Sequence, residues 1–327
     1  MRAFILAGGF ATRLWPLTEK RAKPLLPLAG KPLLTHLVEK IPEGIGITVS
    51  TNSVFSDDFE AWKEDTRPAY RPGRHKTQDT RIEILIEDTG HEDEKLGALG
   101  AVAKWITEEK IDDDVLLIAG DNYVGFSIEA FIDKYMGRPL LAAYDIKDKE
   151  KAKLFGTVIT EGSHVKAFEE KPDNPKSTLV STGCYILPRD SLSEVVTYAK
   201  EHPDNIGGIF EHFLKKGITV DCASFTDPWF DIGSFEAYLE ATYALVGNDV
   251  HIGKTCSAPP EQNTFEGSNV IGNNSNVKGS TLRNVVLFEN CEIEDSVLEN
   301  CIIDNNCTLK GVDLTDKMLR EGTKLLR

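Results

Sequence analysis

Short apolar runs alternate with segments of helical periodicity up to about residue 247, and this alternation constrains the fold more than any other feature of the chain. The run VLLIAG at 115–120 is continuously apolar, which is typical of a strand buried on both faces. Alternating strands and helices predict an open, mostly parallel sheet flanked by helices. The expected strands are 3–7, 46–50, 82–87, 115–119, 140–144, 165–169, 179–187 and 219–224. The expected helices are 31–41, 96–107, 128–135, 192–200, 207–215 and 235–245.

The residues after about 250 have a different texture, rich in Asn, Ser and Gly, with a short apolar pulse every five to six residues. Periodic short strands separated by polar turns predict a solenoid. The pulse residues are Val270, Val277, Leu282, Leu287, Ile293, Leu298, Ile303 and Leu309. Three cysteines fall within the repeat, and we expect them to be buried as small apolar side chains rather than to bind a metal ion. They are Cys291, Cys301 and Cys307.

The composition predicts a globular protein of two domains. With 327 residues the chain can bury a large core, and we place a Rossmann-like α/β domain at 1–247 and the solenoid at 248–327. A formal net charge of −15 argues against nucleic acid or an anionic membrane as a partner. No window approaches the length of about 18 apolar residues that a membrane helix needs, and the six cysteines lack C-x-x-C spacing. We therefore expect a cytoplasmic protein that binds neither nucleic acid nor membrane.

The N-terminal segment has the features of a phosphate site. An apolar run is followed by Gly8 and Gly9. Thr12 and Arg13 come next, and Lys23 follows ten residues after the arginine. Glycines let backbone N–H groups approach an anion closely, while arginine and lysine neutralise its charge. Neither the P-loop pattern nor the dinucleotide fingerprint is present, and for the glycine pair alone an ordinary strand-to-helix turn is the alternative.

Residues 3–32, AFILAGGFATRLWPLTEKRAKPLLPLAGKP, resemble the N-terminal signature of the sugar-1-phosphate nucleotidyltransferases. The consensus of that family runs approximately L-A-G-G-x-G-T-R-L-x-P-L-T, then P-K-P-L/M-L-P and K-P. Phe10 and Ala11 depart from it where the family commonly has a glycine, whereas the arginine, the lysine and the turn are retained. The resemblance implies the reaction NTP + sugar-1-phosphate → NDP-sugar + pyrophosphate.

The resemblance also implies a nucleotide site. Arg13 and Lys23 would hold the triphosphate and stabilise charge on the departing pyrophosphate. Glu87 would occupy the place where thymidylyl enzymes have a base-reading glutamine. Gly97 opens LGALGAVAKW, which matches a family segment beside the base, although its small residues equally fit close helix packing. The full expected nucleotide-binding set is Leu6, Ala7, Gly8, Gly9, Thr12, Arg13, Lys23, Glu87 and Gly97.

Two aspartates are expected to hold Mg²⁺, which prefers hard oxygen ligands. Asp121 follows the strand at 115–119 in the tripeptide GDN, and Asp231 lies in PWFDIGSF. Each alone also fits a turn or a helix cap. The resembling family, however, uses one aspartate after its central strand and another in a W-x-D-x-G segment for Mg²⁺. We also expect Ser234 to cap the following helix.

Three further segments resemble the family's sugar-phosphate site: FGTV at 155–158, FEEKP at 168–172 and VSTGCYIL at 180–187. The implied sugar-phosphate residues are Asn122, Gly156, Glu170, Lys171, Thr182 and Gly183. Lys171 would position the attacking phosphate, so it joins Arg13, Lys23 and Asp121 as a catalytic residue. Without the resemblance, the charges at 169–171 fit a solvated turn before a proline.

The sequence favours dTTP or UTP as the nucleotide and glucose-1-phosphate as the sugar. Guanylyl transfer to mannose-1-phosphate and a catalytically silent sugar-nucleotide-binding subunit are the alternatives, and a bifunctional acyltransferase is disfavoured by the short repeat. The repeat resembles a left-handed β-helix, which in that family takes about 18 residues per coil and would give two to three coils here. We expect it to serve packing or assembly, and the protein to be a homo-oligomer.

The stretch 63–81 is polar, interrupted by prolines and without periodicity, so it is expected to be a surface loop. The alternative is a basic lid over the nucleotide phosphates, suggested by Arg67, Arg71, Arg74 and Lys76.

Overall fold

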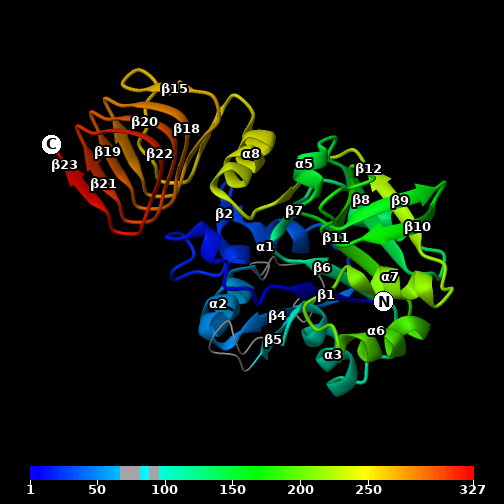
Figure 1. The fold of residues 1–327 in the computed structure, drawn as a ribbon. Helices are drawn as coiled ribbons and strands as arrows, with labels where there is room; N and C mark the ends of the chain where they lie inside the picture. Colours follow the sequence, from blue (N-terminus) through cyan, green and yellow to red (C-terminus); the bar gives the residue numbers. More distant parts are fainter. Residues whose placement is uncertain (67–81, 88–95) are drawn as a thin grey trace. The chain divides into compact units, whose positions relative to one another are not determined.

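The structure is a computed structural model that describes residues 1–66, 82–87 and 96–327 (Figure 1). The chain packs as two compact units. The sheet unit comprises residues 1–9 and 34–229, and the solenoid unit comprises 10–33 and 230–327. Residues 10–33, here called the signature segment, thus pack with the C-terminal third of the chain. The division at 247/248 stays a prediction, and the four basic residues of the suggested lid lie outside the described residues.

The sheet unit is built on one nine-stranded sheet. Its strands, in spatial order, are β5 (Ile82–Glu87), β4 (Gly46–Asn52), β1 (Arg2–Leu6), β6 (Val115–Ala119), β11 (Leu179–Leu187), β8 (Leu140–Asp145), β12 (Asp221–Phe225), β10 (His164–Glu169) and β9 (Thr157–Glu161). The first four strands are parallel, whereas β11 runs antiparallel to both neighbours and β10 does the same. The sheet is therefore rich in parallel strands, as predicted, with β11 and β10 as the two strands that run the other way. A continuously apolar strand has the same pattern in either direction, so the sequence could not distinguish them.

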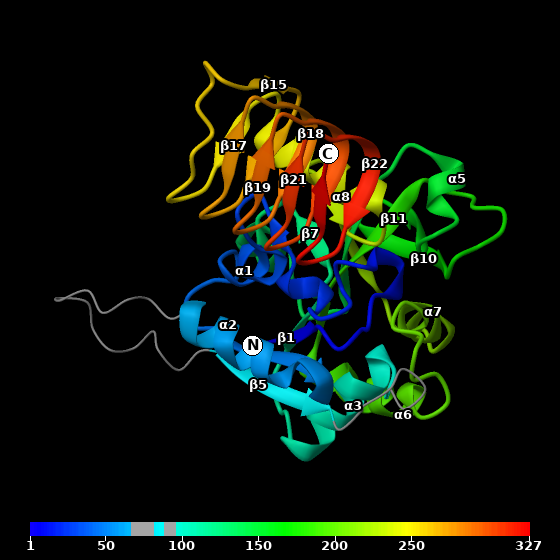
Figure 2. The same cartoon turned by 90° about the vertical axis from the view of Figure 1, so that its left-hand side faces the viewer.

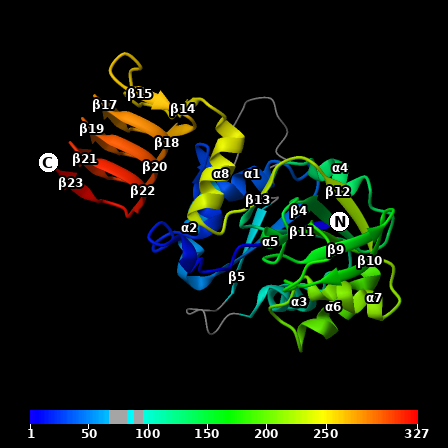
Figure 3. The same cartoon turned by 45° about the horizontal axis from the view of Figure 1, so that its top comes forward.

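Helices cover the sheet, and their apolar faces form the main core. The helices are α1 (Leu33–Val38), α2 (Ser56–Thr66), α3 (Ala98–Glu108), α4 (Ile128–Ile132), α5 (Lys149–Ala152), α6 (Leu192–Ala199) and α7 (Gly208–Lys215). Helices α3, α6 and α7 lie together on one face (Figure 3), where Trp105, Val195 and Phe210 join one buried cluster with strand residues such as Phe4. Packing of this cluster fixes the positions of the strands and therefore the positions of their carboxyl ends.

The helix expected from residue 31 begins at Leu33, which corrects the predicted start. The residues before it form a small antiparallel pair, β2 (Pro27–Leu28) with β3 (Lys31–Pro32). Ala29 and Gly30 both have positive φ, so they make a tight turn that reverses the chain. Short elements that the pattern did not predict are the 3₁₀ turns at Thr12–Leu14 and Lys23–Leu25, β7 (Asn122–Val124) and β13 (Trp229–Asp231).

In the solenoid unit, helix α8 (Phe235–Val246) precedes two sheets of parallel strands. The larger sheet contains β14 (Val250–Ile252), β16 (Asn269–Ile271), β18 (Thr281–Leu287), β20 (Val297–Ile303) and β22 (Asp313–Leu319), with β15 (Thr264–Glu266) on β18. The smaller contains β17 (Asn276–Lys278), β19 (Glu292–Glu294), β21 (Thr308–Lys310) and β23 (Lys324–Leu326), whose rungs are seen in Figure 2. The eight pulse residues and the three cysteines are buried, as predicted.

The coil repeats every 16 residues, because Thr281 pairs with Val297 and Val297 with Asp313. This repeat is shorter than the expected length of about 18, and the ladder β16–β18–β20–β22 has more rungs than the two to three coils expected. The chain turns at residues of positive φ that recur at the same coil positions. They are Asn274, Asn290 and Asn306; Gly279, Asp295 and Gly311; and Asn284, Asn300 and Asp316.

Asn, Asp and Gly are the residues that tolerate left-handed backbone best, so the polar part of the repeat sets the corners and the apolar part fills the interior. At one corner the side chains also form a ladder: the amide of Asn284 donates to Asn300 (3.2 Å), and that of Asn300 donates to Asp316 (3.1 Å). The parallel coils are compatible with a β-helix.

Candidate functional site

The glycine turn follows β1, whose parallel neighbours are β4 and β6. The side-chain amide of Asn52, at the end of β4, donates to the carbonyl oxygen of Gly8 (3.0 Å). The backbone N–H of Ala7 donates to Ser50 (2.9 Å), so Leu6 and Ala7 end β1 in register with the next strand. Gly9 has no atom within 4 Å of the position of an added Cβ, which leaves its backbone open to a ligand.

Glu87 ends β5 and is 7% exposed. Its carboxylate accepts a hydrogen bond from the Ser50 hydroxyl and lies so close to Gly8 that an added Cβ there would be 3.2 Å from Oε1. Burial raises the pKa of Glu87, while the Ser50 hydrogen bond and the charge of Lys104 oppose that rise. The structure therefore brings a buried, readily protonated acid to the glycine turn.

Gly120 and Asp121 follow β6 beside that turn. The N–H of Gly120 donates to the carbonyl of Leu6 (2.8 Å), and a Cβ at Gly120 would lie 2.6 Å from the same oxygen. Only glycine allows this approach of the two strand ends. The side-chain amide of Asn122 donates to Asp121 Oδ1 (2.7 Å), which orients the carboxylate.

The expected sugar residues lie on the next strands. Gly183 has φ +73°, and a Cβ there would be 2.8 Å from that of Ala119 at the end of β6. The Thr182 hydroxyl donates to the carbonyl of Ala142 (2.9 Å), and the Trp229 indole N–H donates to the carbonyl of Thr182 (3.1 Å). The carbonyl of Gly156 accepts from the N–H of Ser181 (2.8 Å), which brings that glycine to the same strand.

Glu170 and Lys171 follow β10. A Cβ on Gly156 or on Gly207 would lie 3.1 Å or 2.3 Å from Glu170 Oε2, so both glycines make room for this carboxylate. Desolvation of the buried carboxylate raises the pKa of Glu170, and the charge of Lys171 opposes this rise. The residue as a whole is exposed. Lys171 has φ +42° and its N–H donates to Phe155 (3.2 Å), so the backbone of the turn is held.

Gly97 precedes α3 with φ +78°. A Cβ at this position would be 2.5 Å from the backbone of Pro203, and the N–H of Leu99 donates to the Pro203 carbonyl (2.8 Å). Close packing alone thus requires this glycine, and a nucleotide role for it stays a prediction.

Within the solenoid unit, the predicted residues of the signature segment meet Asp231. Lys23 is buried, and its Nζ lies 3.2 Å from Asp231 Oδ1. A Cβ on Gly233 would be 3.5 Å from both Arg13 Nη2 and the Asp231 carboxylate, so this glycine borders both charged groups. Thr12 and Arg13 are exposed at the 3₁₀ turn. Two cations beside one carboxylate form a surface suited to a polyphosphate that brings its own metal ion.

Ser234 begins α8 as predicted, because its hydroxyl accepts from the N–H of Ala237 (3.2 Å). This cap fixes the turn that carries Asp231.

Asp121 belongs to the sheet unit and Asp231 to the solenoid unit. Both offer the carboxylate oxygens that Mg²⁺ takes, and Mg²⁺ usually needs only one or two of them besides substrate phosphates. Among residues 1–66, 82–87 and 96–327, no three acidic, histidine or cysteine side chains gather as a ready metal site. The carboxylate oxygens of Asp121 and those of Asp231 are each of the kind that Mg²⁺ accepts.

Sequence reasoning missed Ser50 and Asn52, which contact Glu87 and Gly8. Their signal was present: TVSTN places small polar residues at the carboxyl end of an apolar strand, where ligands of α/β sheets collect.

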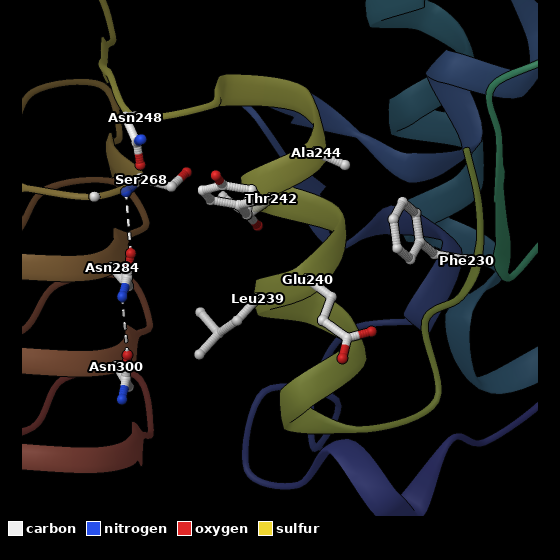
Figure 4. A pocket seen from close by; sticks show the side chains of 11 residues that line it. Phe230, Leu239, Glu240, Thr242, Ala244, Asn248, Ser268, Asn284 and Asn300 are labelled. Carbon is white, nitrogen blue, oxygen red and sulfur yellow. Dashed lines mark hydrogen bonds between the residues drawn. The ribbon is translucent and has the colours of Figure 1, made fainter. Parts of the chain in front are cut away.

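A separate hollow of about 680 Å³ lies between α8 and the solenoid corner (Figure 4). It is lined by Phe230, Leu239, Glu240, Thr242, Tyr243, Ala244, Asn248, Gly267, Ser268, Asn284 and Asn300. None of these described lining residues is a lysine or an arginine, so this hollow does not suit a phosphate.

A family model described as "Nucleotidyl transferase" matches residues 2–247. The chain belongs to this family. Among curated nucleotidyltransferase relatives, a bifunctional protein GlmU of Methanocaldococcus jannaschii is 28% identical over 75% of this chain and 54% of its own length. A putative mannose-1-phosphate guanyltransferase of Sulfolobus acidocaldarius is 25% identical over 87% of this chain and 75% of its own. A UTP–glucose-1-phosphate uridylyltransferase of Synechocystis is 24% identical over 85% and 72%.

The nucleotidyl transferase fold is also seen in a solved structure. A putative glucose-1-phosphate thymidylyltransferase from Bacillus anthracis superposes with a TM-score of 0.60 at 22% identity, covering 74% of this chain and 94% of that one. The relatives differ in the nucleotide that they are named for, so they support the family of sugar-1-phosphate nucleotidyltransferases and leave the base and the sugar open. Among the helices of the described ranges, none has the length and apolar character to cross a membrane.

Proposed function

We propose that the chain joins an NTP to a sugar-1-phosphate. An oxygen of the sugar phosphate attacks the α-phosphorus in line, the bond to the β-phosphate breaks, and pyrophosphate leaves with the electron pair. The observation that carries this proposal is the place of Asp231, whose carboxylate lies 3.2 Å from Lys23 and borders Gly233 together with Arg13, in a member of this family. Because both reactants are anionic, charge neutralisation and alignment are what the protein must supply.

Each predicted residue then has a part in this reaction. Arg13 and Lys23 neutralise the triphosphate and the departing pyrophosphate. Lys171 holds the sugar phosphate, Glu170 binds sugar hydroxyls, and Thr182 lines the sugar pocket. Asp121 and Asp231 would hold Mg²⁺, which would supply further charge neutralisation on the phosphates when bound.

A protonated Glu87 would favour thymine or uracil as the base. A protonated carboxyl has one donor and one acceptor, as a glutamine amide does, and burial favours that protonated form. Thymine and uracil present a matching N–H and carbonyl. An ionised Glu87 would instead only accept, which suits the neighbouring N–H donors of guanine and favours the guanylyl alternative.

A matrix of NTPs against sugar-1-phosphates, scored by pyrophosphate release, tests the activity. We expect turnover with dTTP or UTP and glucose-1-phosphate; turnover with GTP and mannose-1-phosphate alone would replace that pair. Pyrophosphate release should stop in EDTA and return with Mg²⁺, and activity that persists in EDTA would contradict the metal role. Silence in every combination would favour the regulatory subunit.

Asp121→Asn should cut turnover by at least roughly 10²-fold, the scale for loss of a charge-stabilising group. The matched control is Asp57→Asn on the exposed first turn of α2, which should keep wild-type turnover. Near-normal turnover of the Asp121 variant would remove it from the metal site.

We also propose that the coils form a short left-handed β-helix with an assembly role. Exposed Ile252, Val297 and Leu326 on this unit support contact between copies in a homo-oligomer. Sedimentation velocity tests this, and a monomer at all concentrations would contradict it.

A further inference from the structure

One position of the solenoid coil contacts the signature segment in successive coils. Gly272, Phe288, Asp304 and Arg320 are 16 residues apart, each directly after a strand of the larger sheet, and the last three contact the segment. We call these four residues the corner column. Phe288 and Asp304 keep the coil ladder, since their N–H groups donate to Ile303 and Leu319 in the next coil. An aromatic ring, an acid and a base therefore occupy equivalent places in consecutive rungs.

Asp304 and Phe288 hold Arg21 of the signature segment. Arg21 Nη1 lies 3.2 Å from Asp304 Oδ1, and the carboxylate side chain is 6% exposed. The same guanidinium lies 5.5 Å from the centroid of the Phe288 ring. Burial raises the pKa of Asp304 although Arg21 opposes the rise, so an apolar residue here would avoid a desolvation cost. The carboxylate pairs with the arginine that faces it and also accepts a hydrogen bond from the N–H of Asn305 in its own coil (2.7 Å).

The next rung carries the opposite charge and meets the opposite partner. Arg320 forms an ion pair with Glu19, two residues before Arg21. A third contact comes from α8, where the Tyr238 hydroxyl donates to the carbonyl of Pro27. Asp304 thus pairs with Arg21, and Arg320 pairs with Glu19. If the signature segment moved by one rung, residues of like charge would face each other.

These contacts lie on both sides of Lys23, at Glu19 and Arg21 before it and at Pro27 after it. Arg21 lies two residues before Lys23 and eight after Arg13. A shift of Arg21 would therefore move Lys23 directly.

We propose that Asp304 and Arg320 are positioning residues for the triphosphate. They act through Arg21 and Glu19 and set where the signature segment presents its two cations. The solenoid thus contributes to nucleotide binding as well as to packing. This inference rests on the proposed function.

Steady-state kinetics of Asp304→Asn against both substrates test the proposal. We expect the KM for the NTP to rise about 10- to 100-fold, the scale for displaced binding groups. The KM for the sugar-1-phosphate should stay unchanged, because its predicted residues belong to the sheet unit. A merely structural role would lower the active fraction, hence the apparent kcat, and leave both KM values unchanged. That result, or an equal rise in both KM values, would overturn the proposal.

A second experiment on the positioning role reverses the charges of the Glu19–Arg320 pair. Arg320→Glu should raise the KM for the NTP, and the double variant Glu19→Arg/Arg320→Glu should return it toward the wild-type value. Failure of this rescue would contradict the role of Arg320. The matched control is Glu294→Gln, which removes a solenoid carboxylate that pairs with Lys310 (2.9 Å), and both KM values should remain those of wild type.

Amide hydrogen exchange separates this proposal from the proposed function. If wild-type protein releases no pyrophosphate with any substrate pair, the proposed function fails. The rate of amide exchange in residues 10–33 still measures how firmly the corner column holds the signature segment. Asp304→Asn should speed exchange there at least about tenfold, whereas Glu294→Gln should not. Equal exchange in the wild type and Asp304→Asn would overturn the positioning role whatever the activity.

Discussion

The Lys23–Asp231 pair predicts an asymmetry between two substitutions that remove the same contact. The Lys23 side chain is 6% exposed and that of Asp231 is 29% exposed, with 3.2 Å between Nζ and Oδ1. At an effective dielectric constant of about 20, the attraction of two charges at this distance is about 5 kcal/mol. Asp231→Asn removes a carboxylate charge from beside a buried ammonium, so we expect a loss of about 3–5 kcal/mol in the free energy of unfolding. Lys23→Met leaves a carboxylate that water can reach, so its cost should be about 1 kcal/mol.

Urea unfolding at pH 7, followed by circular dichroism, measures both losses. Glu261→Gln, an exposed acid of the same unit, is the control and should shift the free energy of unfolding by no more than about 0.5 kcal/mol. If Lys23→Met destabilises the protein as much as Asp231→Asn, the argument from burial of the ammonium is wrong.

Three further comparisons test the packing of glycine, the titration of Glu87 and the coil corners. Gly120→Ala should cost about 1–3 kcal/mol because its Cβ would lie 2.6 Å from the Leu6 carbonyl, whereas Gly9→Ala has open space and should be nearly neutral; equal unfolding midpoints would refute this. The raised pKa of Glu87 means that the native state binds the extra proton, so stability falls as pH rises from the unfolded value of about 4.5 through the raised pKa. The stability gained in Glu87→Gln should therefore grow across that window, and a gain independent of pH would contradict the assignment. Asn290 has φ +58°, so Asn290→Val should lose about 1–2 kcal/mol in thermal unfolding while Asn290→Gly loses little; the reverse order would exclude the corner role.

The sequence pattern predicted the strands where apolar runs were long and bounded. The predicted ranges 82–87, 115–119 and 179–187 match β5, β6 and β11 to the residue. Helix α2 was missed because only Phe59 and Trp62 are buried in a strongly polar segment, too few to set a period. The direction of β11 was missed because pairing partners depend on tertiary packing.

The candidate site was predicted in its members more than in its geometry. Lys23 and Asp231, 208 residues apart, were each named from the family resemblance, but their direct contact was not predicted. Their polar neighbours at the end of β4 were not foreseen, since small polar residues at strand ends are common. The corner column was hidden for another reason: charges spaced by 16 residues look like surface positions until the coil length is known.

The partnership of the signature segment with the far end of the chain also orders events in time. Lys23 and Arg21 leave the ribosome 208 and 283 residues before Asp231 and Asp304. At about 5–20 residues per second, that is a delay of roughly 10 to 60 s. During this interval β1 can already pair with β4 and β6, whereas Asp304 and Asp231 have not yet been made for Arg21 and Lys23. A nascent chain cannot therefore hold Arg21 and Lys23 in place until the coils have been made, and translation that stalls before them leaves the signature segment without these contacts.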